Sequence, residues 1–498
     1  MATAVLAVAL ALTAGGEQTK MRDLPPPFPR EMRGVWVATV SNIDWASSRT
    51  RTTTQQRTEA NTILDKCVEI KANAVFLQMR PACDALYPSQ IEPWSEYLTN
   101  VMGNAPNPLY DPLQYWIDEA KKRGLELHVW FNPYRARASS GTSAVSSGHV
   151  SITHPQLVRN YGNEKWLDPG EPLTPDYTRS VIRDVITRYD VDGVHFDDYF
   201  YPYPISGTPF PDDSSYAAYQ AGGGTLGRSD WRRDNVNRLV QSLYQEIKEL
   251  RPNVKFGISP FGIWRPGNPS GITGLDAYAS LYADSRKWLQ QGWVDYLAPQ
   301  LYWTIASSGQ SYPRLLEWWT QQNPKGRHVW AGNFTSNVGS SYGDWPVSEI
   351  INQITVTRGQ AGATGNIHFS ARALRGNWKG ITDELKNGVY AKHALSPAYP
   401  WLDNRPPTAP RVGLLGSAST TYTFAWKHRR EEPLHVWTAY RRYGRTWTSE
   451  ILPISRSNWT VPSSSAEGPL TALAIAAVDR NGNESPLSLW TNDRYKGR

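Results

Sequence analysis

Short apolar runs alternate along much of the chain with longer segments in which apolar residues recur every three to four positions. The short runs are typical of buried strands, and the longer segments are typical of amphipathic helices. Eight runs predict strands, at residues 34–40, 73–80, 125–132, 193–197, 254–260, 294–302, 328–333 and 366–370. Six segments between them predict helices, at residues 54–71, 112–123, 175–189, 231–250, 280–291 and 347–360.

Eight strands that alternate with helices over about 340 residues predict a (β/α)8 barrel, the TIM barrel of the α/β class. A doubly wound open sheet is the alternative, but the glycine-rich phosphate loop that often marks it is missing. We assign the barrel to residues 30–399.

The pattern changes after Tyr399. Residues 400–407 are rich in proline and indicate a linker, and residues 408–498 alternate apolar and polar positions between turn residues. This period of two predicts an all-β sandwich. No catalytic groups are evident in it, so its expected role is spacing or docking on a cell envelope, with sugar binding second.

An apolar segment of small residues near the N-terminus, at 4–14, is typical of the core of a secretory signal peptide, which we assign to residues 1–16. The positive charge expected before such a core is missing, which leaves open a start upstream of Met1. No apolar run approaches the ~20 residues of a membrane-spanning helix. We therefore expect a secreted, periplasmic or cell-envelope protein without a membrane span.

The formal net charge of +7 favours acidic partners, such as an acidic glycan or an anionic envelope. Lysine and arginine are scattered and form no stripe, so we expect no nucleic-acid partner. The 22 tryptophans and 26 tyrosines offer flat faces with polar edges, on which sugar rings can pack. Composition therefore favours a polysaccharide substrate.

One stretch, DGVHFDDYFYPYP at 192–204, has the strongest chemical signal. Successive side chains on a strand point to opposite faces, so His195 and Asp197 share one face. The strand then ends in Asp197 and Asp198, followed by Tyr199 and Tyr201. Acids at the mouth of a buried strand, ringed by aromatics, indicate a carbohydrate site. Aspartates that cap the next turn are the alternative, which leaves the aromatics unexplained.

Further candidates come from the other strand ends, where barrels of this type carry their chemistry. Arginines there could pair with a substrate carboxylate or neutralise the site's own acids, and both roles stay open. The polar residues that end strands on predicted inward positions are Arg80, Asn132, Gln300, Asn333 and Ser370. The following loops add Trp94, Glu96, Tyr134, Arg135, Arg137, Trp264, Tyr302 and Trp303 as binding candidates.

Glycoside hydrolysis usually needs one ionised and one protonated carboxyl. We expect Asp197, near arginine and histidine, to stay ionised. Glu92 lies between apolar neighbours that raise a carboxyl pKa, which makes it the expected acid. Asp198 and Glu96 are the alternatives. The nine histidines are dispersed without metal-ligand spacing, so we expect neither a metal nor another cofactor.

The blocks at 31–47, 73–99, 127–136, 192–204 and 296–303 resemble, in order, those of the bacterial glycosyl-hydrolase-like family ten. This family consists of envelope proteins, and the resemblance covers roughly residues 30–400. It implies a barrel, glycosidase activity and, by analogy with a division-site member, cleavage of peptidoglycan strands that lack stem peptides. It also implies a catalytic acid in the block that contains Glu92. Around Trp426 and residues 477–485 the C-terminal part resembles a fibronectin type III module.

Two classes of function compete at this point. The first is a secreted glycosidase that cuts a bacterial cell-wall glycan with two carboxylates. The second is a glycan-binding envelope protein that has kept the groove without turnover. A glycosidase acting on another polysaccharide, of algal or plant origin, is a third possibility.

Overall fold

The computed structural model describes residues 24–339, 343–428 and 431–492. The chain forms two compact units, one spanning Arg30–Pro397 and the other formed by the segments on either side of it. We describe each unit by itself.

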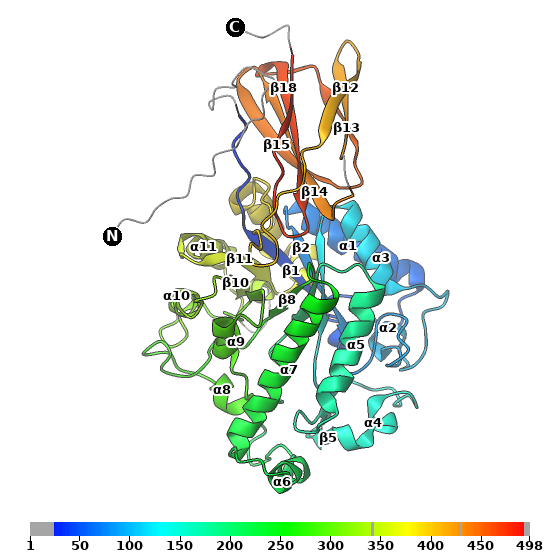
Figure 1. The fold of residues 1–498 in the computed structure, drawn as a ribbon, viewed down its shortest axis with the longest axis vertical. Coiled ribbons are helices and arrows are strands. Elements are labelled where there is room, and N and C mark those ends of the chain that lie inside the picture. The colour runs from blue at the N-terminus through cyan, green and yellow to red at the C-terminus, as the bar shows by residue number, and fades with distance from the viewer. Residues whose placement is uncertain (1–23, 340–342, 429–430, 493–498) are drawn as a thin grey trace. The chain divides into compact units, whose positions relative to one another are not determined.

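The larger unit is a closed barrel of eight parallel strands, in the order β1-β11-β10-β9-β8-β7-β3-β2 (Figure 1). The predicted TIM barrel is therefore confirmed. Its strands are β1 (Met32–Val37), β2 (Ala74–Arg80), β3 (Glu126–Phe131), β7 (Gly193–Phe196), β8 (Lys255–Ile258), β9 (Tyr296–Leu297), β10 (His328–Asn333) and β11 (Ala363–His368).

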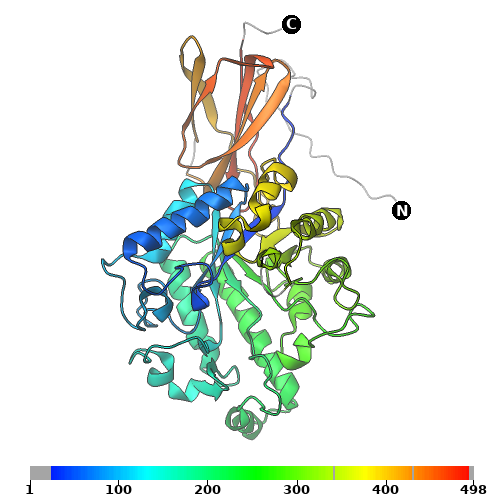
Figure 2. The same ribbon diagram turned by 180° about the vertical axis from the view of Figure 1, so that it is seen from behind.

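Helices surround the barrel, and α1 and α12 pack together near the point where β1 pairs with β11, as the view from behind shows (Figure 2). The helices are α1 (Thr53–Glu69), α2 (Glu96–Thr99), α3 (Pro112–Lys122), α4 (Val150–Thr153), α5 (Thr174–Arg188), α6 (Asp213–Ala221), α7 (Arg228–Leu250), α8 (Ala277–Ser280), α9 (Ser285–Gln291), α10 (Tyr312–Gln321), α11 (Val347–Gly359), α12 (Ala371–Arg375) and α13 (Ile381–Glu384).

The helices differ from the predicted ones in several places, and the short helices α2, α4, α6 and α12 were not predicted. The segment predicted as one helix at 280–291 is divided into α8 and α9, because the chain between them has a left-handed residue, Tyr282, with a φ of 52°. Helix α10 was not predicted. Its buried Leu315, Leu316 and Trp319 follow helical spacing, but they lie in a segment whose aromatic and polar composition resembles a loop.

Aromatic rings fill the inside of the barrel, where branched aliphatic side chains are more usual. The ring of Tyr296 stacks on that of Trp330 with 4.1 Å between centroids, and Phe76 lies 4.6 Å from His128. Glycines make room for these rings: a Cβ on Gly257 would lie 2.0 Å from the Tyr296 ring. Within the barrel, a large ring on one strand therefore packs against a glycine on the neighbouring strand, as Tyr296 does against Gly257.

The longest helix, α7, shows why these segments are helical. Its buried Val236, Leu239, Val240, Leu243 and Ile247 recur at the spacing of one helix face. Asp230 in the first turn and Lys248 in the last turn both suit the helix dipole. α7 and α5 pack against each other on the flank of the barrel (Figure 1).

Loops after the strands extend the barrel at one end, where β5, α4 and α6 lie (Figure 1). A small antiparallel sheet there has the order β4-β6-β5, formed by β4 (Arg135–Arg137), β5 (Val158–Tyr161) and β6 (Glu164–Leu167). This sheet follows β3 directly, so it carries Arg135 to the carboxyl ends of the barrel strands.

The second unit contains two antiparallel sheets around a core of Phe424, Trp437, Trp459 and Ile475, as the predicted β-sandwich requires. One sheet is β12-β13-β16, and the other contains β15, β14, β18, β17 and β19. The strands are β12 (Arg411–Ser417), β13 (Thr421–Lys427), β14 (Leu434–Tyr443), β15 (Thr446–Pro453), β16 (Asn458–Pro462), β17 (Ser464–Ser465), β18 (Gly468–Asp479) and β19 (Ser488–Thr491).

Within the described part of the chain, no helix has the length and apolar character that crossing a membrane would require. The predicted signal peptide at residues 1–16 lies outside the described residues.

Candidate active site

Asp197 and Asp198 follow directly after β7, at the carboxyl end of the barrel, and each is only 4% exposed. Oδ2 of Asp197 accepts hydrogen bonds from Trp130 Nε1 (3.1 Å) and from the side-chain amide of Asn132. Asn132 Oδ1 in turn accepts from Gln78 Nε2 at 2.6 Å. Neighbouring strands β2 and β3 thus hold the Asp197 carboxyl in place.

Asp198 has a separate set of donors. Gln300 Nε2 donates to Asp198 Oδ1 (3.1 Å) and also to the Ser259 carbonyl (3.1 Å). The Tyr203 hydroxyl donates to Asp198 Oδ2. Since Gln300 and Ser259 follow β9 and β8, the two aspartates are held by opposite neighbours of β7.

Burial has a large effect on the charge of this pair. Burial and, after it, the negative charge of Asp198 together raise the pKa of Asp197 from 3.8 to about 7, against the lowering effect of Arg135. Burial also raises the pKa of Asp198. Two carboxyls that interact this strongly lose their protons in two steps that belong to the pair. The pair therefore keeps a proton to a higher pH than an exposed aspartate does.

We expected Asp197 to stay ionised, whereas its surroundings raise its pKa to about 7. Burial outweighs the attraction of Arg135. His195 supplies no positive charge, because burial and the neighbouring His128 keep its pKa well below the usual range. Instead His195 lies inside the barrel, where its Nε2 accepts from Trp36 Nε1 at 3.0 Å and its Nδ1 lies 3.1 Å from the Tyr296 hydroxyl.

Arg135 is the cation that acts on both carboxyls. Its Nε donates to the Pro81 carbonyl at 2.9 Å, and its guanidinium lies over the Tyr199 ring, 4.8 Å from the centroid. The side chain is 5% exposed, and its Nη2 has no hydrogen-bond partner within the described structure. Arg135 therefore keeps one buried donor that has no partner in the described structure.

Half-buried aromatic rings, together with the exposed Tyr203, form a continuous rim next to the pair. Tyr199 lies 5.7 Å from Tyr203, Tyr203 lies 6.4 Å from Phe261, and Phe261 lies 5.6 Å from Trp303. Tyr302 packs 5.1 Å from Phe334. Tyr203, Phe261 and Phe334 were not among the predicted site residues, although Tyr203 lies in the same 192–204 block as the aspartates.

Comparison with known proteins decides the family. The model of the family described as "Glycosyl hydrolase-like 10" matches residues 31–345. The chain belongs to this family. It is 43% identical over 395 residues to "Glycosyl hydrolase YngK" of Bacillus subtilis (strain 168), a match that covers 77% of this chain and 76% of that protein. It is 40% identical over 308 residues to "Glycosyl hydrolase DigH" of Escherichia coli (strain K12), covering 58% and 69%.

Among solved structures, the barrel of this glycosyl hydrolase is similar to the PgaB (BpsB) glycoside hydrolase domain from Bordetella bronchiseptica. The two share 14% identity with a TM-score of 0.48, over 72% of this chain and 98% of that one. The described residues of the hydrolase contain no group of three or more histidine, cysteine, aspartate or glutamate side chains arranged for a metal.

Glu92, the expected acid, lies instead in a buried ion pair. Its Oε1 is 2.6 Å from Arg80 Nη2 and accepts from the Tyr177 hydroxyl at 3.0 Å, and both side chains of the ion pair are 0% exposed. Arg80 gives its other donors to the Asn132 carbonyl (2.6 Å) and to Cys83 Sγ (3.0 Å). A register shift between Gln78 and Arg80 interrupts the strand alternation that predicted an inward Arg80. The charged groups of both side chains are therefore paired within the protein.

Glu96 and Arg137 fasten a loop. Glu96 Oε2 accepts from the amides of Thr142 (2.8 Å) and Ser143 (2.9 Å), and Glu96 also pairs with Arg49 (2.7 Å) and Arg137 (3.3 Å). Both predicted residues therefore hold the loop after β4, and Arg137 is neutralised by a carboxylate of the protein.

The other candidates are placed in two ways. Gln300, Asn132, Tyr199, Tyr302 and Trp303 lie at the pair or its rim, as described above. Tyr134, Tyr201 and Asn333 are buried, at 0%, 1% and 0% exposure. Asn333 forms hydrogen bonds with Tyr312, Gln353 and Asn366, because Trp330 and Gly332 take the inward positions of β10.

Three further candidates have partners elsewhere in the barrel unit. Trp94 is half-buried against the core, and Trp264 stacks on Trp318 with 5.8 Å between ring centroids. Ser370 donates a hydrogen bond to Asp44 at 2.8 Å.

Proposed function

We propose that this hydrolase cuts the glycan of the bacterial cell wall, in strands that lack stem peptides, with Asp197 and Asp198 as its two carboxyl groups. The observation that carries the proposal is the buried pair of carboxyls, which fixed donors hold in place and whose pKa values burial raises. The function uses Asp198 where Glu92 was the expected partner.

The pair meets the chemical requirement of glycoside hydrolysis. One carboxyl must protonate the oxygen that leaves, while the other, ionised, acts as nucleophile or as the base that activates water. Two neighbouring carboxylates repel each other, so one carboxyl ionises at a lower pH and the other keeps its proton to a higher pH. The ionised group and the protonated group can then take the two roles. The rim of Tyr199, Tyr203 and Trp303 offers faces on which sugar rings can pack.

Arg135 supports a carboxylated substrate. A peptidoglycan strand without stem peptides exposes a lactyl carboxylate on every second sugar, whereas an attached peptide converts this group to an amide. Of the three arginines predicted to meet it, Arg80 and Arg137 are paired with Glu92 and Glu96. Arg135 keeps a free Nη2 donor, and guanidinium–carboxylate pairs are strong.

We further propose that the protein works in the cell envelope and that the C-terminal sandwich, as a fibronectin type III-like module, spaces or docks the barrel there. The apolar segment at 4–14 and the resemblance around residues 477–485 support this.

The decisive test is mass spectrometry of products from purified peptidoglycan treated with an amidase, beside intact peptidoglycan and neutral chitin oligomers. We expect saccharide fragments from the denuded strands and much slower release from the other two substrates. Equal rates on all three would contradict the proposed substrate, and no release from any of them would contradict the proposed activity on cell walls.

Arg135→Gln is expected to raise KM for the denuded glycan about tenfold or more, since charge-assisted hydrogen bonds are lost, and to leave KM for a neutral chitin oligomer nearly unchanged. Arg137→Gln is the matched control, which should affect both substrates alike. Steady-state kinetics on the two glycans check this. An equal KM change on both substrates for Arg135→Gln would show that Arg135 meets no carboxylate.

The barrel unit alone, residues 30–397, should keep its rate on soluble oligosaccharides, because the pair and its donors all lie within this compact unit. We expect its co-sedimentation with intact cell walls to fall several-fold. Circular dichroism melting provides the folding control. A well-folded fragment that binds walls as strongly as the full chain would exclude a docking role for the sandwich.

A further inference from the structure

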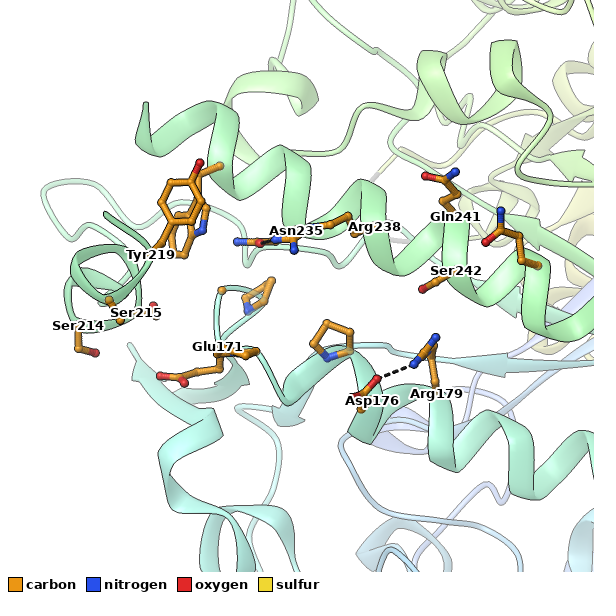
Figure 3. Close-up of a pocket in the computed structure, with 17 residues that line it drawn as sticks. Glu171, Asp176, Arg179, Ser214, Ser215, Tyr219, Asn235, Arg238, Gln241 and Ser242 are labelled. Carbon is orange, nitrogen blue, oxygen red and sulfur yellow. Dashed lines mark hydrogen bonds and ion pairs between the residues drawn. The ribbon is translucent and has the colours of Figure 1, made fainter. Parts of the chain in front are cut away.

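A cavity of the barrel unit lies away from the aspartate pair, between helices α5 and α7 (Figure 3). It has a volume of about 710 Å³ and continues into a second cavity of about 490 Å³. Arg179, Ser242 and Gln245 line both cavities, which therefore form one groove. Along α7 the groove extends from Trp231 to Leu250, about 28 Å at 1.5 Å per residue.

A buried donor points to a ligand in this groove. Asn235 lines the cavity, is 3% exposed, and uses its Oδ1 to accept a hydrogen bond from Arg238. Its Nδ2 has no partner in the described structure. A buried amide that lacks a partner destabilises the fold, so a ligand hydroxyl or carbonyl that accepts from Nδ2 would be favoured.

Charges in the groove balance one another. Arg179 bonds Asp176, as the dashed line in Figure 3 shows, and also lies 3.6 Å from Glu246. Arg238 pairs with Asp234 at 3.1 Å, and Glu171 pairs with Arg159. A strongly charged polymer such as a nucleic acid gains little here. The same polar lining makes a lipid chain a poor occupant.

The groups that remain for a ligand are amides, hydroxyls and flat apolar faces. Gln241 and Gln245 offer amide donors and acceptors, and Ser242 adds a hydroxyl. Prolines at 169, 172 and 175 and the ring of Tyr219 supply the apolar faces. Sugar rings combine hydroxyl groups with flat C–H faces, so this lining fits a neutral sugar better than it fits the other classes.

The aromatic end of the groove is rigid. The Tyr219 ring packs 5.8 Å from Trp231 and 6.1 Å from Tyr216, and its hydroxyl accepts from the Leu226 amide at 3.0 Å. A Cβ on Gly224 would lie only 2.2 Å from this ring, which explains the close approach of the chain there. A wall ordered before binding lowers the entropy lost when a ligand binds.

We propose that this α5–α7 groove is a second, non-catalytic glycan site that binds neutral N-acetylated sugar residues of the polymer. Only the identity of the polymer rests on the proposed function. Holding one part of a strand in the groove raises the local concentration of the rest near the aspartate pair. The groove thus favours long strands over short ones.

The test titrates the full chain with chitotetraose, in an Asp198→Asn background that stops turnover, and follows amide hydrogen exchange by mass spectrometry. We expect protection in α6 and along α7, together with protection at the rim of the pair. Tyr219→Ala, and separately Gln241→Ala with Gln245→Ala, should remove the α6–α7 protection and weaken binding to insoluble chitin roughly tenfold, the factor that about 1.4 kcal/mol gives.

Gln220→Ala is the matched control, since Gln220 is exposed on the same helix as Tyr219 and does not line the cavity. In the active enzyme the groove variants should cut a short soluble oligosaccharide at the normal rate. Unchanged chitin binding and protection in the glutamine pair, with normal melting, would overturn the groove site. If chitotetraose protects the groove but not the rim of the pair, this result contradicts the proposed function and supports the groove site.

Discussion

Asp197→Asn and Asp198→Asn will each lower turnover by about 10²–10⁴-fold, the usual contribution of a positioned acid or base. The reason is that either change leaves a single titratable carboxyl, which cannot be proton donor and anion at once. Asp118→Asn, an exposed carboxyl on α3, is the control and should be silent. Initial rates on amidase-treated peptidoglycan measure the effect. Near-normal turnover in either variant would remove that residue from the mechanism.

The pH dependence of kcat/KM is a second test of the aspartate pair. As pH rises past about 7, the shared proton leaves, so kcat/KM of the natural enzyme should fall. In acid the rate should fall again, because both carboxyls become protonated. A profile that stays flat from neutral to alkaline pH would show that no proton held by Asp197 takes part.

The same shift in pKa predicts an effect on stability. Between its ordinary pKa of 3.8 and about 7, Asp197 binds more protons in the folded chain than in the unfolded chain. Stability therefore falls as pH rises through this window. Asp197→Asn removes this loss, worth at most about 4 kcal/mol at 1.36 kcal/mol per pKa unit. Its melting temperature should exceed that of the natural protein at pH 8 and approach it at pH 4.

Glu92→Gln will destabilise the fold by about 3–5 kcal/mol, because it leaves the buried Arg80 guanidinium without its counter-charge. Chemical denaturation of the purified protein measures this. Replacing both partners, Arg80→Met with Glu92→Leu, should restore much of the loss, since no uncompensated charge stays buried.

This variant also decides between the two carboxyl assignments. Glu92→Gln with normal stability and a turnover lowered by orders of magnitude would make Glu92 the acid, as the sequence resemblance implies. A large loss of stability with turnover preserved in the folded fraction would keep the role of Glu92 structural.

Aromatic rings occur in the barrel core, at the rim of the pair and in the α5–α7 groove. The rings of Tyr296 and Trp330 fill the barrel, those of Tyr203 and Trp303 line the rim, and that of Tyr219 lies in the α5–α7 groove. Composition alone indicated carbohydrate binding, but it could not separate core rings from surface rings.

Local sequence determined most of the fold and the centre of the site. The alternation of strand and helix patterns depends on neighbours within one segment, so the eight barrel strands could be read directly. Asp197 and Asp198 could be placed as well, because strand β7 ends where the 192–204 block turns polar, and strand ends in such barrels converge.

Only the tertiary structure decided which polar groups lie beside the aspartate pair. Arg80 and Asn333 both end strands, yet neither side chain points to the centre of the barrel. A register shift in β2 places Arg80 in an ion pair with Glu92. In β10 the inward position belongs to Trp330, so Asn333 points outward and bonds Gln353 of helix α11. The neighbours of Glu92 in the sequence are apolar, but its neighbours in the structure are polar. Tyr177, from the distant helix α5, and Arg80 both donate hydrogen bonds to its carboxylate. Partners of a buried charge come from segments far apart in sequence, and their choice depends on packing that no single segment encodes.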